Sequence, residues 1–337
     1  MDDVRFMKEA LQEGRKGLGK VSPNPPVGAV IVSKDGETIL GRGWHQKAGS
    51  AHAEVEAIRN ANEQNSSVPL NGTTIYVTLE PCSTEGRTPA CTDAILEAGF
   101  GRVVIGTLDP NPAHAGAAID ILKAGNVEVE TGVCEIECLD LIRFFGKHIT
   151  TGMPWVIAKS AITLDGRTTL TPERGRWISC PESRKDVQRI RVECDAILVG
   201  GETVRLDNPH LTLRGEFAGD RKQPWRVVFT SSGDLPESSH LFTDEFSDRT
   251  KVIQGQDLSG ALSGLGQMGI TSVLLESGGR LFAHALAENL IDEVILYQAP
   301  IIGGGKNRLL PVDGIVKDLR DVSFSAIGRD QKIRGFL

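Results

Sequence analysis

The sequence feature that most constrains the fold is a set of metal-binding residue types, His52-Ala53-Glu54, Pro81-Cys82 and Cys91. An apolar run rich in β-branched residues, Thr73 to Leu79, precedes the first cysteine and predicts a strand. Helical patterns begin near His52 and near Cys91, which places both residues and Glu54 in first turns of helices. A chain that brings two helix starts and one strand end together is expected to be a sheet covered by helices.

These residue types suit catalytic zinc, which takes three protein ligands and keeps a fourth position for water. His52, Cys82 and Cys91 supply three ligands, and the carboxylate of Glu54 can carry a proton from the attacking water to a leaving amine. Each residue alone is more often an ordinary core or surface residue. Their combination predicts a hydrolytic deaminase.

The spacing of the cysteines narrows the substrate. Nucleobase deaminases carry two residues between these cysteines, whereas eight residues, from Ser83 to Ala90, separate them here. The net charge of −7 arises mainly in the first 150 residues, although nonspecific nucleic-acid binding favours a basic face. We therefore expect a small-molecule substrate and no nucleic-acid partner.

The chain is long enough for two domains, at 337 residues. Strands alternate with helices up to a last helix predicted over residues 136–146, and a polar break follows at Thr150-Thr151-Gly152-Met153-Pro154. A strand and a helix then begin again, while residues 231–264 are rich in Ser, Gly and Asp and predict no regular structure. We expect two α/β domains, residues 1–150 and 151–337.

Other sequence features argue for the cytoplasm. The N-terminus lacks the basic and then apolar order of a signal peptide, and no apolar run approaches the ~18 residues of a membrane span. The six cysteines are too sparse for a disulfide framework, and Cys134 and Cys138 are interpreted as small buried hydrophobes. We expect no membrane partner and a homo-oligomer.

The N-terminal motifs resemble the bifunctional deaminase/reductase family of riboflavin biosynthesis. They comprise Pro23-Asn24-Pro25-Pro26-Val27-Gly28, His52-Ala53-Glu54, Leu79-Glu80-Pro81-Cys82-Ser83, Gly86-Arg87-Thr88-Pro89-Ala90-Cys91 and Asp109-Pro110-Asn111-Pro112. The resemblance implies a cytidine-deaminase-like three-layer α/β/α domain that removes the 2-amino group of 2,5-diamino-6-(5-phosphoribosylamino)pyrimidin-4-one. It also implies substrate contacts from Asn24, His45, Arg87, Asp109 and Asn111. For the asparagines, loop capping is the alternative.

The second half resembles the reductase of the same family, which implies a dihydrofolate-reductase-like α/β domain that uses NADPH to reduce the ribosyl group to ribityl. Its matching stretches include Lys159 to Arg167, Thr203 to Pro209 and Leu274 to Gly279. The implied cofactor contacts are Ala161, Trp177, Thr203, Asp207, Gly278, Gly279 and Arg280, and the implied sugar-substrate contacts are Gly175, Arg191, Leu211, Arg214 and Glu276.

The residues alone are less decisive for this half. Gly278-Gly279 suits close approach to phosphate but lacks the Gly-x-Gly-x-x-Gly fingerprint, so an ordinary tight turn is the alternative. Surface ion pairing is the alternative for Arg191, Arg214, Asp207 and Glu276. Positions that depart from the family pattern are Thr84, Glu85, Thr163, Ser179, Cys180 and Thr230.

Two rival functions remain at this point. One is a zinc deaminase of transfer-RNA bases with a C-terminal RNA-binding domain, which should be basic and rich in exposed aromatics, whereas aromatics make up only 5% of the chain. The other is an inactive scaffold, and the complete set of His52, Glu54, Cys82 and Cys91 argues against it.

Overall fold

The computed structural model describes residues 2–64, 69–84, 89–112, 114–219 and 221–337. The chain divides into two compact units, Met1–Gly152 and Met153–Leu337. Both units combine helices with a sheet, which confirms the predicted α/β class. The domain boundary expected after residue 150 falls inside the last turn of a helix, since α6 ends at Thr151.

The elements of the first unit follow the alternation expected from the sequence. In chain order they are α1 (Asp3–Arg15), β1 (Gly28–Val32), β2 (Ile39–Trp44), α2 (Ala53–Gln64), β3 (Thr74–Leu79), α3 (Cys91–Ala98), β4 (Arg102–Thr107), α4 (Ala117–Ala124), β5 (Glu128–Thr131), α5 (Glu135–Leu141) and α6 (Arg143–Thr151).

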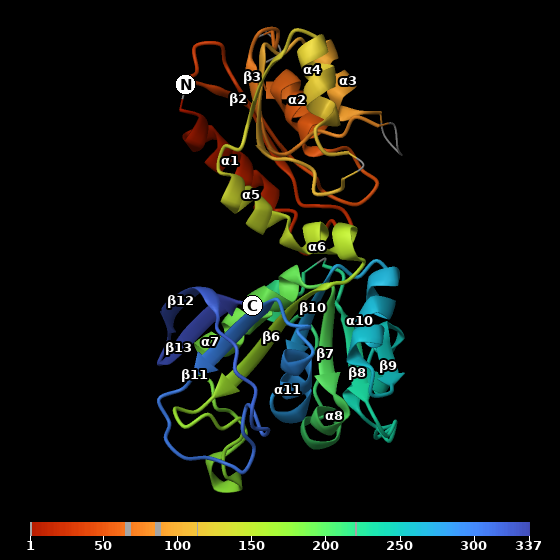
Figure 1. The fold of residues 1–337 in the computed structure, drawn as a ribbon, viewed down its shortest axis with the longest axis vertical. Coiled ribbons are helices and arrows are strands. Elements are labelled where there is room, and N and C mark those ends of the chain that lie inside the picture. The colour runs from red at the N-terminus through yellow and green to blue at the C-terminus, as the bar shows by residue number, and fades with distance from the viewer. Residues whose placement is uncertain (1, 65–68, 85–88, 113, 220) are drawn as a thin grey trace. The chain divides into compact units, whose positions relative to one another are not determined.

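The described strands of this unit form a five-stranded sheet in the order β2-β1-β3-β4-β5. The predicted hairpin is present, because β1 pairs antiparallel with β2, and β3, β4 and β5 pair in parallel. Side chains of α1 and α5 pack on one face, while those of α2, α3 and α4 pack on the other. The result is the predicted three-layer arrangement (Figure 1).

Glycines let the helices approach this sheet closely. A β-carbon on Gly43 in β2 would lie 2.3 Å from the carbonyl oxygen of Ala53 and 2.3 Å from the amide nitrogen of Ala57, both in α2. On the other face, a β-carbon on Gly28 would lie 2.0 Å from the carbonyl oxygen of Ala10 in α1. These contacts are with backbone, which cannot rotate away, so only glycine permits the observed helix positions.

The second unit is also an alternation of strands and helices. Its elements are β6 (Trp155–Ile162), the 3-10 turn η1 (Pro172–Arg174), α7 (Pro181–Glu193), β7 (Ala196–Gly200), α8 (Gly201–Asp207), η2 (Gly215–Phe217), β8 (Trp225–Thr230), α9 (His240–Thr243), η3 (Ser247–Arg249), β9 (Thr250–Gln254), α10 (Leu258–Gln267), β10 (Ser272–Glu276), α11 (Gly279–Ala287), β11 (Glu293–Gln298), β12 (Arg320–Ile327) and β13 (Asp330–Phe336).

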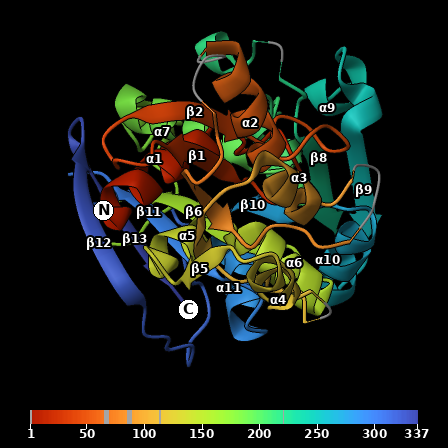
Figure 2. The ribbon, with the colours of Figure 1, turned by 90° about the horizontal axis from the view of Figure 1, so that it is seen from above.

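The described strands of the second unit form an eight-stranded sheet in the order β12-β13-β11-β6-β10-β7-β8-β9. All neighbouring strands from β11 to β9 pair in parallel, whereas the C-terminal hairpin β12-β13 adds antiparallel pairs. Figure 2 shows β12 and β9 at the two edges. One face packs against α10 and α11, and the other against α8 and α9.

Three expectations need correction. The helix predicted over residues 136–146 is two helices, because Ile142 leaves the helical region (φ −99°, ψ 12°) between α5 and α6. Residues 231–264 are not irregular, since they contain α9, β9 and most of α10. The caps Ser239 and Asp257 accept hydrogen bonds from backbone amides there, and apolar residues such as Leu262 are buried. Cys138 is buried as expected, but Cys134 is only half-buried.

Among the described residues, no helix has both the length and the apolar character that crossing a membrane requires.

We predict that Gly43→Ala destabilises the first unit by roughly 3 kcal/mol or more, because the added methyl group collides with the backbone of α2. Thermal unfolding followed by calorimetry measures the loss. Gly146→Ala is the matched control, since its β-carbon would lie 3.9 Å from the nearest atom and alanine favours a helix. Equal unfolding temperatures for both variants would contradict the prediction.

Candidate active sites

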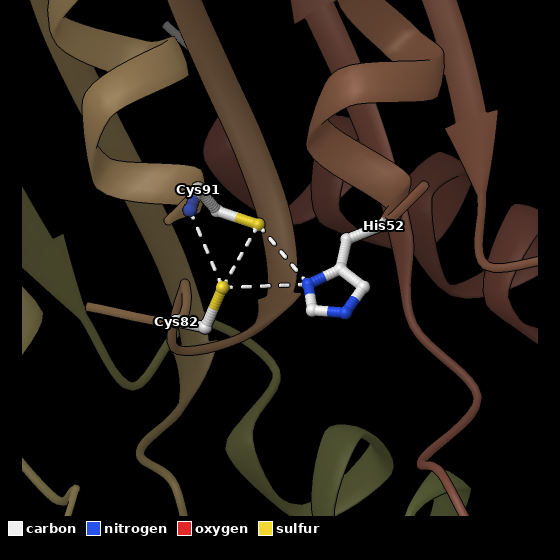
Figure 3. Close-up of side chains that lie close together, drawn as sticks. All are labelled: His52, Cys82 and Cys91. Carbon is white, nitrogen blue, oxygen red and sulfur yellow. Dashed lines mark hydrogen bonds between the residues drawn. The ribbon is translucent and has the colours of Figure 1, made fainter. Parts of the chain in front are cut away.

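The first site lies where two helices begin beside the end of β3. The sequence predicts His52 in the first turn of α2, but this residue immediately precedes that helix, which begins at Ala53. Cys91 is the first residue of α3, as predicted, and Cys82 lies in the loop after β3. Figure 3 shows that the three side chains point toward one another. Their ligand atoms all lie within 4.8 Å of one another, so within the described part of the chain these three residues could hold a metal ion.

The distances between the donor atoms fit one bound metal ion. His52 Nδ1 lies 3.1 Å from Cys91 Sγ and 3.4 Å from Cys82 Sγ, and the two sulfurs are 3.2 Å apart. Tetrahedral zinc with Zn–S near 2.3 Å and Zn–N near 2.0 Å requires separations of about 3.6–3.8 Å. The observed separations are shorter than this spacing, and small movements of the side chains would provide it. The donor set therefore fits zinc in its chemistry and needs only a local adjustment in its geometry.

The hydrogen bond between the two cysteines favours the thiolate of Cys82 and the thiol of Cys91. Contact with Cys91 is the largest cause that lowers the pKa of Cys82 to about 4, and the same shared hydrogen bond raises the pKa of Cys91. The backbone N–H of Cys91 also donates to Cys82 Sγ at 3.3 Å, from the N-terminus of α3. Thiolates are stabilised at such helix starts, and a metal ion completes their deprotonation.

Glu54 lies in the first turn of α2 and is buried, with 3% of its surface exposed. Burial raises the pKa of its carboxyl group, while the charge of His52 opposes the rise. A carboxyl group with a raised pKa holds and releases a proton more readily near neutral pH than a solvated carboxylate does. The environment of Glu54 therefore suits a proton carrier beside the ligand cluster.

Asn24 and His45 form a polar pair next to His52. The ring of His45 meets that of His52 edge to face, with centroids 5.3 Å apart. His45 Nδ1 lies 3.1 Å from the carbonyl oxygen of Ala51, which can only accept, and burial lowers the pKa of His45. The neutral ring thus presents Nε2 as an acceptor for Asn24 Nδ2 at 3.0 Å. This hydrogen bond orients the carboxamide and turns its oxygen away from the ring.

The loop after β4 carries two more expected substrate contacts, Asp109 and Asn111. Asp109 Oδ1 accepts a hydrogen bond from the backbone N–H of Asn111 at 2.8 Å, and burial raises the pKa of Asp109. The side chain of Asp109 therefore caps the start of its own loop. Arg87, the expected phosphate contact, lies outside the described residues, as does the family departure at Glu85.

The second site is built at the carboxyl end of β10. Glu276 is the last residue of that strand, and its carboxylate contacts Arg191 Nε at 2.5 Å and Lys159 Nζ at 3.3 Å. Burial alone would raise the pKa of Glu276, but the charges of Arg191 and Lys159 prevail and lower it to about 2. Two cations share one carboxylate here, so the alternative of simple surface pairing does not describe Arg191 and Glu276.

Leu211 and Arg214, two further expected substrate contacts, lie three residues apart in the sequence. Leu211 is buried and has a φ of 51°, an uncommon conformation for a non-glycine residue. Within the described residues no ion pair involves Arg214, whose pKa is lowered by partial burial and by the charge of Arg191. The charge of Glu276 partly offsets this effect. A guanidinium that forms no ion pair within the described chain and lies near a second cation favours a bound anion. The expected contact Gly175 also has a positive φ, of 80°.

The expected cofactor contacts surround the ends of parallel strands. Gly278 is the N-cap of α11 and Gly279 is the first residue of that helix, and a β-carbon on Gly278 would approach Thr168 Cγ2 to 2.8 Å. Arg280, in the first turn of α11, reaches Glu202 at 3.5 Å. The remaining contacts are Ala161 in β6, Thr203 and Asp207 in α8, and Trp177, which is 56% exposed and contacts Arg176 and Arg184 through cation–π pairs.

Three of the positions that depart from the family pattern, Thr163, Thr230 and Cys180, have structural contacts of their own. The Thr163 hydroxyl donates to Asp165 at 2.7 Å and accepts from the backbone of Arg167, roles that a serine can also fill. The Thr230 side chain occupies the space where Gly201 would carry a β-carbon. Cys180 occupies the N-cap position of α7, and its backbone N–H donates to Asp330 at 2.7 Å.

Two residues of these sites were not singled out from the sequence. Lys159 belongs to a stretch that carries the resemblance, but only the pairing of β6 with β10 places it opposite Glu276. Glu80 stands in the motif before Cys82, and its buried carboxylate accepts backbone hydrogen bonds from the loop after β4. A charged residue directly after an apolar strand was the only available signal for Glu80.

Comparison with known proteins assigns both halves. Residues 1–107 match the family described as the cytidine and deoxycytidylate deaminase zinc-binding region, and residues 154–333 match the RibD C-terminal domain. The second match covers the region in which the alternative required an RNA-binding domain, so that alternative is not supported. The first match agrees with a zinc site at His52, Cys82 and Cys91.

Full-length relatives agree with this assignment. The riboflavin biosynthesis protein RibD of Aquifex aeolicus is 38% identical over 322 residues, which cover 90% of this chain and 88% of the relative. The RibD protein of Escherichia coli is 37% identical over 348 residues, which cover 94% of this chain and 93% of the relative.

Solved structures extend the likeness to the fold. RibD of Acinetobacter baumannii has a TM-score of 0.87 at 36% identity, and a diaminohydroxyphosphoribosylaminopyrimidine deaminase/5-amino-6-(5-phosphoribosylamino)uracil reductase of Thermotoga maritima has 0.89 at 33%; each covers 99% of this chain and 98% of the solved chain. With its deaminase and reductase domains in that order, the chain belongs to the RibD family of bifunctional riboflavin-biosynthesis enzymes.

Proposed function

We propose that the first unit deaminates 2,5-diamino-6-(5-phosphoribosylamino)pyrimidin-4-one and that the second reduces the ribosyl group of the product with NADPH, giving 5-amino-6-(5-phosphoribitylamino)uracil. The observation that carries the proposal is the convergence of His52, Cys82 and Cys91 beside the buried Glu54, in a chain that matches RibD proteins along nearly its whole length. The printed activity of the Thermotoga maritima protein supports the choice of substrate.

In the deaminase, His52, Cys82 and Cys91 would hold zinc, which supplies an acidified water molecule when bound. Glu54 accepts a proton of that water at its carboxylate and delivers it to the departing amino group. Asn24, whose carboxamide is fixed by His45, Asp109 and Asn111 would orient the pyrimidine, and Arg87 would bind the phosphate. Ammonia leaves as the second product.

In the reductase, the donors at the carboxyl ends of β6, β7 and β10 would hold the two reactants. Gly278, Gly279 and Arg280 at the start of α11, with Ala161, Trp177, Thr203 and Asp207, would contact NADPH. Gly175, Arg191, Leu211, Arg214 and Glu276 would contact the sugar phosphate. Within the described residues the guanidinium of Arg214 forms no ion pair, which supports its assignment to the phosphate.

Three expectations from the sequence stay predictions: the domain boundary after residue 150, a cytoplasmic location and a homo-oligomer.

The direct test supplies the purified, zinc-replete protein with the diaminopyrimidine phosphoriboside and NADPH, and follows ammonia release and cofactor absorbance. We expect both signals. Absence of both would overturn the proposal, and ammonia without NADPH oxidation would leave only its deaminase half.

We predict that Glu54→Gln retains zinc and loses deamination by roughly 10²–10⁴-fold in kcat, because the amide cannot carry the proton. Metal analysis and ammonia release measure the two effects. Glu56→Gln is the matched control, since Glu56 lies in the same turn but pairs with Arg59 on the surface, and it should behave as wild type. A Glu54→Gln variant with undiminished turnover would remove this residue from its role.

We predict that Arg214→Ala raises the reductase KM for the sugar phosphate by about tenfold or more, because one charge-assisted phosphate contact is lost. Deamination should not change. Steady-state kinetics with each substrate test this, with Arg189→Ala as control because Arg189 is an exposed arginine paired with Asp186. An unchanged KM in Arg214→Ala would contradict the assignment of its guanidinium to the phosphate.

A further inference from the structure

Glu80 is a buried carboxylate that neither the zinc chemistry nor the expected substrate contacts use. It follows β3 directly, stands two residues before Cys82 and is 5% exposed. Its backbone N–H donates to the carbonyl oxygen of Thr107 at 2.9 Å, which extends the parallel pairing of β3 with β4 by one residue. The position of Glu80 is therefore set by the sheet.

The side chain of Glu80 forms hydrogen bonds with both ends of the loop that connects β4 to α4. Its Oε2 accepts hydrogen bonds from the backbone N–H groups of Asp109 at 3.2 Å and Gly116 at 3.0 Å, and its Oε1 accepts one from Ala118 at 3.1 Å. Gly116 is the N-cap of α4 and Ala118 lies in its first turn. One carboxylate thus closes the loop from residue 109 to residue 118 and caps the helix that follows.

This loop carries Asp109 and Asn111, the side chains expected to contact the pyrimidine. Hydrogen bonds within the loop connect its residues. Asp109 Oδ1 accepts from the backbone N–H of Asn111, and the carbonyl oxygen of Asn111 accepts from the backbone N–H of His114 at 2.9 Å. Movement at Asp109 would therefore move Asn111 as well. The backbone of Asp109 is held by Glu80, which stands two residues before the proposed zinc ligand Cys82.

We propose that Glu80 is a positioning residue of the deaminase, which holds the substrate-contacting loop 109–118 at a set distance from the cysteine ligand loop. The inference rests on the proposed deaminase function. Glu80 does not touch the reacting atoms in this role. The pairing of β3 with β4 fixes Glu80, and Glu80 in turn fixes the distance between the cluster of His52, Cys82 and Cys91 and the side chains of Asp109 and Asn111 that would hold the pyrimidine.

A purely structural carboxylate would affect stability alone, so the test compares two variants in the full-length, zinc-replete protein. Glu80→Gln keeps the size of the side chain but replaces one acceptor oxygen with an NH₂ group, which must face at least one backbone N–H. Asp3→Asn is the matched control, because the Asp3 carboxylate in the same unit also accepts three hydrogen bonds, from Tyr76 and twice from Arg102.

We expect Glu80→Gln to retain zinc, to raise the deaminase KM about tenfold with a smaller fall in kcat, and to leave the reductase unchanged. Hydrogen exchange of peptides that cover residues 109–118 should accelerate, because the amides of Asp109, Gly116 and Ala118 lose their shared acceptor. Asp3→Asn should lower the unfolding temperature without changing KM or the exchange of this loop.

Wild-type KM and wild-type exchange in Glu80→Gln would overturn the inference, and so would an equal rise of KM in Asp3→Asn. If Glu80→Gln does not fold, Glu80→Asp takes its place, since it keeps both oxygens but shortens their reach, and the same outcomes decide. A wild-type protein that releases no ammonia would instead overturn the proposed deaminase, and this inference with it.

Discussion

The parallel pairing of β3 with β4 is the constraint on which the deaminase site depends. The register sets Leu79 opposite Thr107, so the segments that follow the two strands leave the sheet at the same edge. One of these segments carries Cys82 and the other carries Asp109, and the carboxylate of Glu80 joins them. Ligands bind at the carboxyl ends of parallel strands because such loops converge there.

Helix placement completes this centre. The close contact of α2 with Gly43 in β2 brings His52 and Glu54 to the sheet, and the start of α3 brings Cys91 to Cys82. Each group comes from a different element, so none is held by local sequence alone. The buried position of Glu54 then raises its pKa, which connects packing to the proton transfer proposed for this residue.

The reductase unit applies the same principle to different chemistry. β6, β7 and β10 run in parallel and end beside one another, where Lys159 and Glu276 face each other across neighbouring strands and Arg191 reaches them from α7. A carboxylate between two cations remains ionised, and the nearby Arg214 keeps its charge without an ion-pair partner in the described chain. In both units the candidate site thus lies at the carboxyl ends of parallel strands, but the side chains placed there differ.

The sequence by itself determined the elements with strong periodicity, such as β4 and α7, the two α/β units and the candidate zinc-binding group of His52, Cys82 and Cys91, because these depend on local pattern and residue type. It did not reveal the break at Ile142, the elements within residues 231–264 or the hairpin β12-β13, because these short elements leave no clear periodic pattern in the sequence. Only the tertiary structure decided that Lys159 meets Glu276 and that Glu80 closes the loop at Asp109, because strand pairing brings together residues far apart in the chain.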